Sequence, residues 1–381
     1  MIIHQEKRTS ENMKFLLISP KNRTTWNFRG DLIRAIIDAG YEVIVTGPDQ
    51  TDVDKITALG ARFVDIPVNK HGTNIIGDLK FCKRLTSLMK TEKPDVTLGY
   101  TIKPVVYGAL AAKLAGVKRS YGMITGGGYT FTARTTKAKV LGIIVRMLYR
   151  VGLACLKGII FQNPDDLEEF TKKGLAPKSK CSMVNGSGIN IETFMPQPYP
   201  EKIRFFMLSR LLKSKGVREY LRAAEIVKKD HPEIEFGILG KYETEMQDAI
   251  PTTEIDRYFS NGIVQRYDET NDVLPYYRAC SVYVLPSYRE GTPRTVLEAM
   301  ACGRPVITTD TNGCRDTVKD GETGYLVPIE NAEAVADAMK KFIENPALIQ
   351  QFGEASRAYC VEKFDVHKVN ADMLRIMEIV Q

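Results

Sequence analysis

Hydrophobic and polar residues along the chain fall into alternating blocks. Short, almost wholly apolar runs, such as 42–47 (EVIVTG) and 281–286 (SVYVLP), are separated by longer stretches with apolar residues at helical spacing. This alternation predicts repeated βαβ units, because buried parallel strands are nearly all apolar. Strands are predicted near 14–19, 42–47, 62–67, 95–99, 119–124, 159–163, 181–185, 203–209, 234–239, 281–286 and 304–309. Helices are predicted near 28–39, 51–60, 74–92, 104–116, 136–156, 164–174, 215–230, 271–279, 293–302, 331–345 and 346–362.

The length of the chain predicts two α/β domains. Its 381 residues exceed one ordinary core. The segment 190–202 holds three prolines and is the best linker, because proline removes a backbone donor and disfavours a preceding helix. We therefore predict Rossmann-like domains at 1–195 and 196–381, facing across a cleft at the carboxyl edges of their sheets. The amphipathic stretch near 366–380 is a candidate to cross back to the first domain.

The composition of the chain restricts the classes of ligand and partner that we expect it to bind. The formal net charge of +7 favours anionic partners such as diphosphates or acidic lipids, but the dense basic clusters of a nucleic-acid binder are missing. Seven scattered cysteines and four dispersed histidines give no disulfide framework and no metal-binding motif. The polar first twelve residues and the lack of a long apolar run predict neither a signal peptide nor a membrane span. We expect a cytoplasmic protein without a bound metal.

The stretch 286–303 (PSYREGTPRTVLEAMACG) carries the clearest candidate chemistry and predicts a strand, a loop and a helix. Thr292 suits the N-cap, Pro293 the first helical position and Gly303 the C-terminal cap. Gly291 lets the backbone approach a ligand closely. The free amides and positive dipole of the helix N-terminus would suit a diphosphate or sugar hydroxyls.

Glu298 lies in an otherwise apolar part of that helix. A buried carboxylate is unfavourable unless it is paired or hydrogen-bonded. Two interpretations stay open from the residues alone. Glu298 either forms an i,i+4 ion pair with Arg294, or accepts hydrogen bonds from a diol such as the hydroxyls of a ribose.

Glu290, Gly291 and Glu298, followed by the run EAMACGRPVI, resemble the paired-glutamate motif of family-four retaining glycosyltransferases, which have the GT-B fold. The resemblance implies that Glu290 and adjacent backbone amides hold the transferred sugar and that Glu298 binds the nucleotide ribose. The run 209–216 (SRLLKSKG) is similar to the family's Arg-x-x-x-x-Lys-Gly element, so Arg210 and Lys215 would clamp the donor diphosphate.

Gly240 lies where the family usually has Gly-x-Gly, and the second glycine of that pair is absent here. The stretch 264–266 (VQR) also departs from the leucine-glycine pair that the family has near its base-contacting backbone. Gly240 is therefore a candidate donor-binding residue, and uridine is the default base.

The first half resembles the branch that extends polyprenyl-diphosphate-linked glycans, through the loops 26–30 (WNFRG), 70–74 (KHGTN), 100–104 (YTIKP) and 124–129 (ITGGGY). In the first of these loops, Asn27 can cap the helix that follows. The candidate acceptor residues are Arg29, Gly30, Lys103, Thr125, Gly126 and Gly127. Arg29 and Lys103 would be either anion contacts or plain surface charges, and the three glycines either a tight turn or room for substrate.

The helix at 136–156 carries a basic stripe. At about 100° per residue, Lys139, Arg146, Arg150 and Lys157 fall on one side of an otherwise apolar helix. Such a helix can lie at an anionic membrane surface with its cations at the lipid headgroups. The alternative is a largely buried helix that shows one charged stripe to water.

The resemblance implies transfer of a sugar, a hexose or N-acetylhexosamine, from a nucleotide diphosphate sugar to a polyprenyl-diphosphate-linked sugar, with retention at the anomeric carbon, in surface polysaccharide or glycan assembly. The expected catalytic residues are Glu290, Arg210 and Lys215, with the UDP-sugar as co-substrate and no further cofactor. The protein would lie peripherally on the inner face of the cell membrane. The alternative is a nonhydrolysing UDP-sugar epimerase of the same architecture, which would convert the donor without an acceptor.

Overall fold

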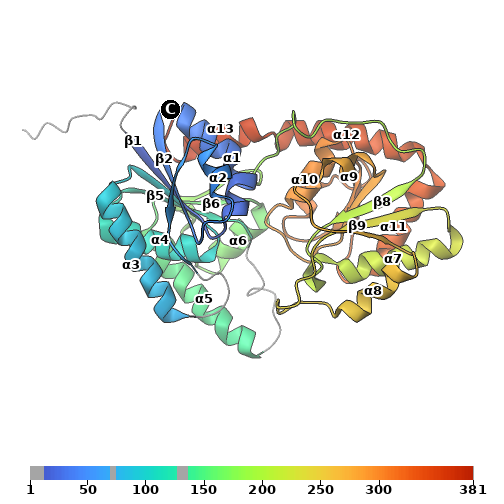
Figure 1. Cartoon of the computed structure of the whole chain (residues 1–381), viewed down its shortest axis with the longest axis horizontal. Coiled ribbons are helices and arrows are strands. Elements are labelled where there is room, and N and C mark those ends of the chain that lie inside the picture. Colours follow the sequence, from blue (N-terminus) through green and yellow to red (C-terminus); the bar gives the residue numbers. More distant parts are fainter. Residues whose placement is uncertain (1–12, 69–73, 127–135, 381) are drawn as a thin grey trace, which may run out of the picture. The chain divides into compact units, whose positions relative to one another are not determined.

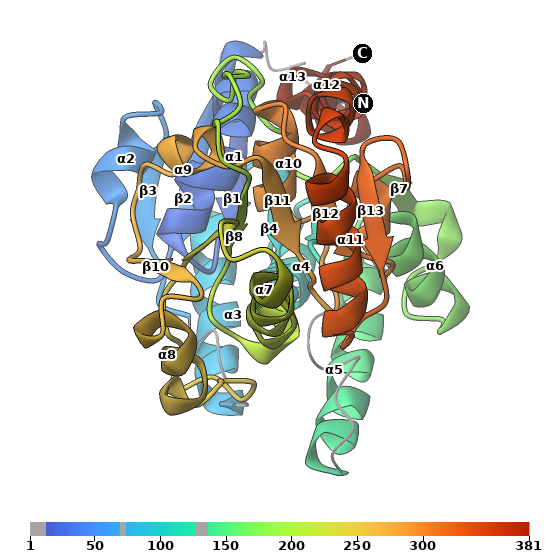
Figure 2. The same cartoon turned by 90° about the vertical axis from the view of Figure 1, so that its right-hand side faces the viewer.

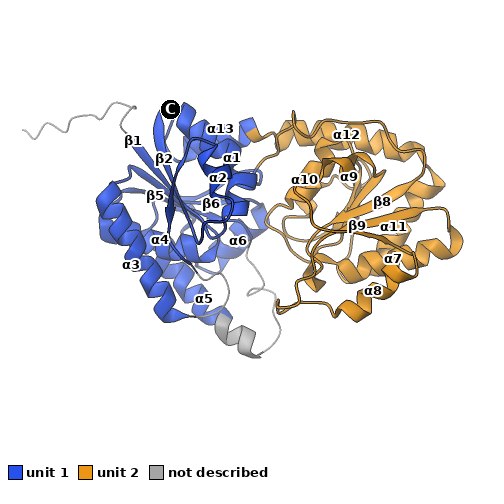
Figure 3. Cartoon of the chain, viewed as in Figure 1, with its two compact units in different colours: residues 1–187, 367–381 blue, residues 188–366 orange. Residues whose placement is uncertain are grey.

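The predicted alternation of strands and helices forms two parallel sheets, each with its own hydrophobic core. The computed structural model describes residues 13–68, 74–126 and 136–380, without the side chains of 136–141. These residues divide into unit 1, comprising 1–187 and 367–381, and unit 2, comprising 188–366 (Figure 3). The two sheets confirm the predicted α/β class.

The sheet of unit 1 has the strand order β3-β2-β1-β4-β5-β6-β7, and all neighbours are parallel (Figure 1). Its strands are β1 (Met13–Ile18), β2 (Tyr41–Gly47), β3 (Arg62–Asp65), β4 (Val96–Tyr100), β5 (Arg119–Ile124), β6 (Gly158–Phe161) and β7 (Cys181–Met183). Every residue of β4 and β6 is buried, as expected for parallel strands covered on both faces. The chain changes direction across the sheet beside β1, so the carboxyl ends of β1 and β4 form its topological switch point.

Helices cover both faces of this sheet. They are α1 (Asn22–Asp38), α2 (Val53–Thr57), α3 (Ile75–Glu92), α4 (Ile102–Ala115), α5 (Thr136–Cys155), α6 (Pro164–Lys172) and, from the end of the chain, α13 (Val366–Ile376). In both views α4 lies between α3 and α5, and it packs against each of them (Figures 1 and 2). The three helices form one layer over the sheet.

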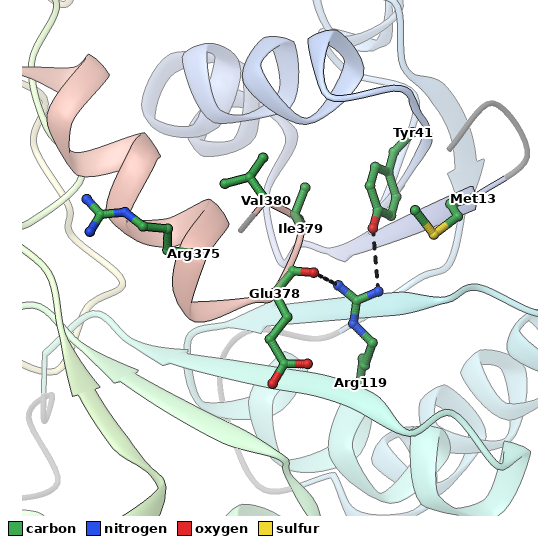
Figure 4. A pocket seen from close by; sticks show the side chains of 7 residues that line it. All are labelled: Met13, Tyr41, Arg119, Arg375, Glu378, Ile379 and Val380. Carbon is green, nitrogen blue, oxygen red and sulfur yellow. Dashed lines mark hydrogen bonds between the residues drawn. The ribbon is translucent and has the colours of Figure 1, made fainter. Parts of the chain in front are cut away.

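The end of the chain is held to unit 1 by apolar packing and by hydrogen bonds. Met373 and Met377 are buried in the same hydrophobic cluster as the residues of β1 and β2. The Arg119 guanidinium donates to the carbonyls of Met377, at 2.9 Å, and Glu378, and reaches the Tyr41 hydroxyl at 3.4 Å (Figure 4). These contacts fix the last residues beside the start of β5.

Unit 2 has the strand order β10-β9-β8-β11-β12-β13, again parallel throughout. Its strands are β8 (Arg204–Leu208), β9 (Glu235–Leu239), β10 (Gln265–Tyr267), β11 (Val282–Leu285), β12 (Val306–Thr309) and β13 (Gly324–Val327). Its helices are α7 (Val217–Asp230), α8 (Thr252–Ser260), α9 (Leu274–Arg278), α10 (Arg294–Ala301), α11 (Ala332–Glu344) and α12 (Ala347–Lys363). The switch point of this sheet lies between β8 and β11.

Several elements differ from the predicted ones. The strands β10 and β13 and the helix α8 were not predicted, and β10 is a short edge strand that is mostly polar. Helix α1 begins at Asn22, six residues before its predicted start at residue 28. The prediction that Asn27 caps this helix is therefore wrong, because Asn27 lies inside it.

The proline-rich segment packs onto unit 2. The fully buried Arg304 donates to the carbonyls of Gln197 and Pro198, at 3.1 and 3.2 Å, and the Tyr199 hydroxyl donates to the Gly303 carbonyl at 2.7 Å. The division between the units lies at 187/188, eight residues before the predicted boundary at 195/196. The carbonyls of Gln197 and Pro198 and the hydroxyl of Tyr199 all form hydrogen bonds with residues of unit 2, so these contacts anchor the segment to that unit.

Candidate active site

The turn after β8 brings Lys215 against the end of β11. Lys213–Lys215 form one turn of 3₁₀-helix, and Gly216 then adopts a left-handed φ of 72° before α7 begins. A Cβ on Gly216 would lie 2.0 Å from the Pro286 carbonyl oxygen. Only glycine permits both the positive φ and this approach. The turn therefore sits directly on the loop that carries Glu290.

Lys215 and Glu290, from the two predicted motifs, meet in unit 2. The Lys215 Nζ lies 2.5 Å from Glu290 Oε1, and the Ser287 hydroxyl donates to the same oxygen at 2.8 Å. Their side chains are 20% and 16% exposed, so a ligand at this edge can reach both charges. The pair supplies a cation for an anionic leaving group and a carboxylate that can accept hydrogen bonds from hydroxyls.

Neighbouring loops hold the Glu290 loop in place. The Ser214 carbonyl accepts from the Tyr288 amide at 2.9 Å, and the Ser287 hydroxyl oxygen lies 3.1 Å from the same carbonyl. The Tyr288 hydroxyl donates to Glu219 Oε1 at 2.8 Å. Burial, together with the Glu219 carboxylate, raises the pKa of Tyr288, so this hydroxyl remains a donor. Sequence reasoning missed Glu219, Tyr288 and Ser287 as supports.

A second glycine locks the other side of the same loop. Gly313 follows β12 with a φ of 75°, and a Cβ there would lie 2.3 to 2.4 Å from the carbonyl oxygens of Gly291 and Glu290. The Glu290 amide donates to the Asn312 carbonyl at 3.1 Å. The loops after β8, β11 and β12 therefore form one rigid support at the carboxyl edge of the sheet.

Helix α10 begins one residue later than predicted. Its first residue is Arg294 and its N-cap is Pro293, whereas Thr292 was predicted as the cap and Pro293 as the first helical residue. Gly303 ends the helix at a φ of 73°, and the next amide, from Arg304, donates back to the Ala299 carbonyl at 2.9 Å. This C-terminal cap is the predicted one. The helix starts directly after the Glu290 loop, so its first amides are at the same edge.

Glu298 is buried and has two protein partners. Its Oε1 lies 3.2 Å from Arg294 Nε, and the Tyr277 hydroxyl donates to its Oε2 at 2.8 Å. Burial raises the pKa of Glu298, while Arg294 and Tyr277 oppose that shift. The i,i+4 ion pair considered from the sequence is thus present. Each carboxylate oxygen can accept further hydrogen bonds, so the pair orients Glu298 without exhausting its capacity.

The remaining donor residues lie at the same edge. Arg210 follows β8 and is exposed. Gly240 follows β9, where a Cβ would lie 1.8 Å from the Ser209 carbonyl oxygen, so glycine is required for close packing. Beside it is a pocket of about 430 Å³, lined by Gly240, Lys241, Tyr242, Arg266, Asp268 and Glu269. Within the described residues, no group of three His, Cys, Asp or Glu side chains is placed to hold a metal ion.

The predicted acceptor residues of unit 1 are placed differently. Arg29 and Gly30 lie inside α1, not on a loop, and Arg29 is only 4% exposed, with its guanidinium 5.3 Å from the centre of the Tyr100 ring. Thr125 and Gly126 follow β5 and are half-buried, with Gly126 at a φ of 123°. Gly127, like the loop at 70–73, lies outside the described residues.

Lys103 is paired with a carboxylate that the sequence did not single out. Its Nζ lies 2.7 Å from Asp78 Oδ1, and the Tyr107 hydroxyl donates to Asp78 Oδ2 at 3.3 Å. Burial and the Asp78 charge raise the pKa of Tyr107 to about 12. Asp78 is 25 residues from Lys103 in the sequence, so no local pattern signals this pair.

Comparison with known proteins matches both halves of the chain. Residues 14–163 match the family model "Glycosyl transferase 4-like", and residues 190–359 match "Glycosyl transferases group 1". A Campylobacter jejuni relative is N,N'-diacetylbacillosaminyl-diphospho-undecaprenol alpha-1,3-N-acetylgalactosaminyltransferase, 25% identical over 88% of this chain and 91% of its own. An Escherichia coli relative is UDP-Gal:alpha-D-GlcNAc-diphosphoundecaprenol alpha-1,3-galactosyltransferase, 26% identical over 74% of this chain and 75% of its own.

Solved structures agree on the fold. A glycosyltransferase from Rickettsia africae superimposes with a TM-score of 0.78 at 18% identity, covering 96% of this chain and 98% of its own. Anabaena HepE in complex with UDP and glucose gives 0.79 at 16% identity, covering 97% and 100%. The family models and the named relatives support glycosyl transfer rather than the epimerase alternative. The chain is therefore a glycosyltransferase of the GT-B fold that uses a nucleotide sugar as donor, built from a glycosyl transferase 4-like domain and a glycosyl transferases group 1 domain.

Proposed function

We propose that this glycosyltransferase moves a hexose or N-acetylhexosamine from a UDP-sugar to a polyprenyl-diphosphate-linked sugar, with retention at the anomeric carbon. The Campylobacter jejuni and Escherichia coli relatives are named for transfer to sugars on undecaprenyl diphosphate. The observation that carries the proposal is the 2.5 Å contact between Lys215 and Glu290. It brings a cation suited to the donor diphosphate next to a carboxylate suited to the transferred sugar.

The leaving diphosphate is stabilised by the two predicted cations. As the bond from the anomeric carbon to the diphosphate oxygen breaks, its electron pair passes to the diphosphate and negative charge grows there. Lys215 and Arg210 face that charge, and the first amides of α10 add partial positive charge. In this proposal the protein's own cations do the work that a divalent metal does in other transferases.

Glu290 holds the transferred sugar by accepting hydrogen bonds from its hydroxyls. The acceptor hydroxyl forms its new bond to the anomeric carbon on the face that the diphosphate leaves. Its proton passes to the departing diphosphate oxygen, so that no protein base is required. This front-face route gives retention because bond formation and bond breaking share one face.

Glu298 binds the ribose of the donor nucleotide. Arg294 and Tyr277 fix its carboxylate, and its remaining lone pairs accept from the two ribose hydroxyls. The pocket beside Gly240 is the proposed place for the base, with uridine the default. In that pocket the Arg266 guanidinium covers the Tyr242 ring at 4.6 Å, which offers a flat surface for stacking.

The acceptor binds on unit 1 around the carboxyl ends of β4 and β5. Lys103 contacts acceptor phosphate, with Asp78 setting its position, and Thr125 and Gly126, which follow β5, leave room for the acceptor sugar. Arg29 and Gly30 support the site from inside α1, since Arg29 is buried against Tyr100. A lipid-linked acceptor supports a peripheral protein on the inner face of the cell membrane, with residues 136–157 nearest the lipid.

The test is release of UDP from a panel of UDP-sugars, with and without a short-chain polyprenyl-diphosphate sugar. Wild type is compared with Glu290→Ala and with the control Glu322→Ala, which changes an exposed glutamate of the same unit. We expect acceptor-dependent release that Glu290→Ala abolishes and Glu322→Ala leaves intact. Conversion of the donor without acceptor, or a product of inverted configuration, would contradict the proposal.

A further inference from the structure

Large exposed apolar side chains gather on two helices of unit 1. On α3 these are Ile75, Ile76 and Leu79, which are 61 to 71% exposed, and on α5 they are Ile143, Ile144, Met147 and Val151, which are 47 to 63% exposed. These seven residues, called the apolar surface below, are more than half of the thirteen such side chains among the described residues. Scattered single apolar residues are ordinary on a protein surface, but a concentration of them marks an interaction site.

Helix α5 is apolar on two faces. Val145, Tyr149 and Leu153 face the core of unit 1, whereas Ile143, Met147 and Val151, at spacings of four residues, share a different, exposed face. At about 100° per residue, Arg146 and Arg150 fall on a stripe between these two faces. A helix exposed to water alone would normally carry polar residues on its outer face.

The two parts of the apolar surface lie at the same end of the helical layer. Helices α3 and α5 flank α4 (Figures 1 and 2). The Lys103–Asp78 pair joins the first turn of α4 to that of α3. On the other side, a Cβ on Gly152 would lie 2.9 Å from Val106 Cα, so this glycine lets α5 pack closely against α4 near the start of α4.

The same layer is strongly basic. The helices α3, α4 and α5 contain ten Lys or Arg residues (four, two and four) and only two acids, Asp78 and Glu92. This is a formal charge of +8 in a chain whose total is +7. The outer helices α7, α11 and α12 of unit 2 are balanced, with eight basic and eight acidic residues. On α3, the exposed Lys80, Lys83 and Arg84 follow directly after the apolar residues.

We propose that the apolar surface inserts into the boundary between headgroups and acyl chains of an anionic membrane, with the exposed basic residues of α3 at the headgroups. The proposal rests on the lipid-linked acceptor proposed above. An anionic bilayer offers both apolar chains for the seven side chains and negative charge for the helical layer. A second copy of the chain would instead bring another +8 layer against the first. Among the described residues, no helix has the length and apolar character to cross the bilayer.

This surface differs from the basic stripe predicted for residues 136–157. Arg150 donates to the Gly174 carbonyl at 3.0 Å, and Lys157 is paired with Glu378 at 2.5 Å. These two cations therefore stabilise unit 1 itself. The apolar face of α5 makes the deeper contact, and α3 supplies exposed cations that do not belong to the stripe.

The experiment is co-flotation of the full chain with vesicles of phosphatidylcholine, alone or with phosphatidylglycerol. The test variant is Ile144→Glu with Met147→Glu, and its matched control in unit 2 is Ile329→Glu with Met195→Glu, also exposed. A charge variant, Lys80→Glu with Lys83→Glu, tests the basic layer. We expect wild type and control to float with anionic vesicles only, and the other two variants to lose at least tenfold in bound fraction.

Measurements of turnover distinguish a failure of this inference from a failure of the proposed function. With a short-chain, water-soluble acceptor we expect the test variant to keep wild-type turnover, and with a long-chain acceptor in anionic vesicles to lose most of it. Equal flotation of wild type and test variant would overturn the inference. So would a wild-type dimer in solution that the test variant disrupts, since the surface would then belong to a second copy. Failure of the proposed function shows instead as no acceptor-dependent turnover by wild type with either acceptor.

Discussion

The candidate donor and acceptor sites teach different lessons about charged residues. In unit 2, Lys215 and Glu290 are 75 residues apart in sequence yet meet at 2.5 Å, both still partly exposed. In unit 1, the two predicted cations are occupied within the unit, Lys103 by Asp78 and Arg29 against the Tyr100 ring. In unit 2, glycines and backbone hydrogen bonds hold the loops in place, so that their charged side chains stay accessible to a ligand. In unit 1, each predicted cation instead contacts another side chain of the same unit.

The largest expected effect is at Lys215. In Lys215→Ala the growing charge on the diphosphate loses its nearest cation, and kcat should fall by about two to three orders of magnitude. Lys215→Arg should recover part of the rate, and Lys213→Ala, an exposed lysine of the same turn, should stay close to wild type. Steady-state UDP release measures all three. A loss of less than tenfold in Lys215→Ala would remove Lys215 from the chemistry.

The next largest effect is at Lys103, where two variants distinguish a role in stability from a role in binding the acceptor. Lys103→Met leaves Asp78 charged and buried, which should lower the free energy of unfolding by about 3 kcal/mol. Adding Asp78→Asn removes that charge and should restore most of the stability, as measured by denaturant unfolding. If Lys103 also contacts acceptor phosphate, the double variant keeps a raised KM for the acceptor with an unchanged KM for the donor. Recovery of both KM values would make the pair purely structural.

A glycine pair tests the locked loop of unit 2. Gly216→Ala introduces both a strained φ and a clash with the Pro286 carbonyl, whereas Gly262→Ala introduces a similar φ of 68° with open space around it. We expect Gly262→Ala to lower the free energy of unfolding by about 1 kcal/mol and Gly216→Ala by about 2 kcal/mol or more. Only Gly216→Ala should also reduce turnover. Equal effects on turnover would mean that the close packing of the Lys215 turn is unimportant.

The smallest expected effect is a pH dependence of donor binding. Because the pKa of Glu298 is raised in the folded protein, Glu298 contributes fully to the free energy of unfolding only below the ordinary glutamate pKa. This contribution is lost as the pH rises through the raised value. Binding of the ribose should instead become stronger as the pH rises, since the ionised carboxylate is the better hydrogen-bond acceptor. The KM for the donor should therefore rise severalfold as the pH is lowered from neutral. In Glu298→Gln this rise should disappear, and an unchanged profile would argue against the ribose contact.

The sequence predicted best where a function constrains a short stretch of backbone. The run from Pro286 to Gly303 follows the strand β11 and contains a tight loop and a helix that is terminated by Gly303. Its local pattern therefore contained the loop and the helix, but the strand predicted for it lies just before it. The edge strand β10 was missed because two of its three residues are polar, so it lacks the apolar pattern of a buried strand. The early start of α1 was missed because Asn22 and the residues after it carry no clear capping pattern.

The sequence also failed to predict contacts between residues that lie far apart along the chain. Asp78 beside Lys103, Tyr277 beside Glu298 and Glu219 beside Tyr288 are brought together only by the packing of different elements. A single sequence contains no signal for such pairs. The anchoring of the proline-rich segment by Arg304 is of the same kind, because a buried guanidinium stabilises carbonyls from four different residues.

The most direct test of the account is a charge swap of the central pair, Lys215→Glu combined with Glu290→Lys, assayed for acceptor-dependent UDP release. The swap keeps opposite charges facing each other at the 2.5 Å contact, so the protein should keep its fold and near wild-type thermal stability. The account predicts no turnover, because the diphosphate would then meet a carboxylate and the sugar an ammonium group. Turnover near wild type in the swapped protein would show that the pair only holds two loops together, and would contradict the account.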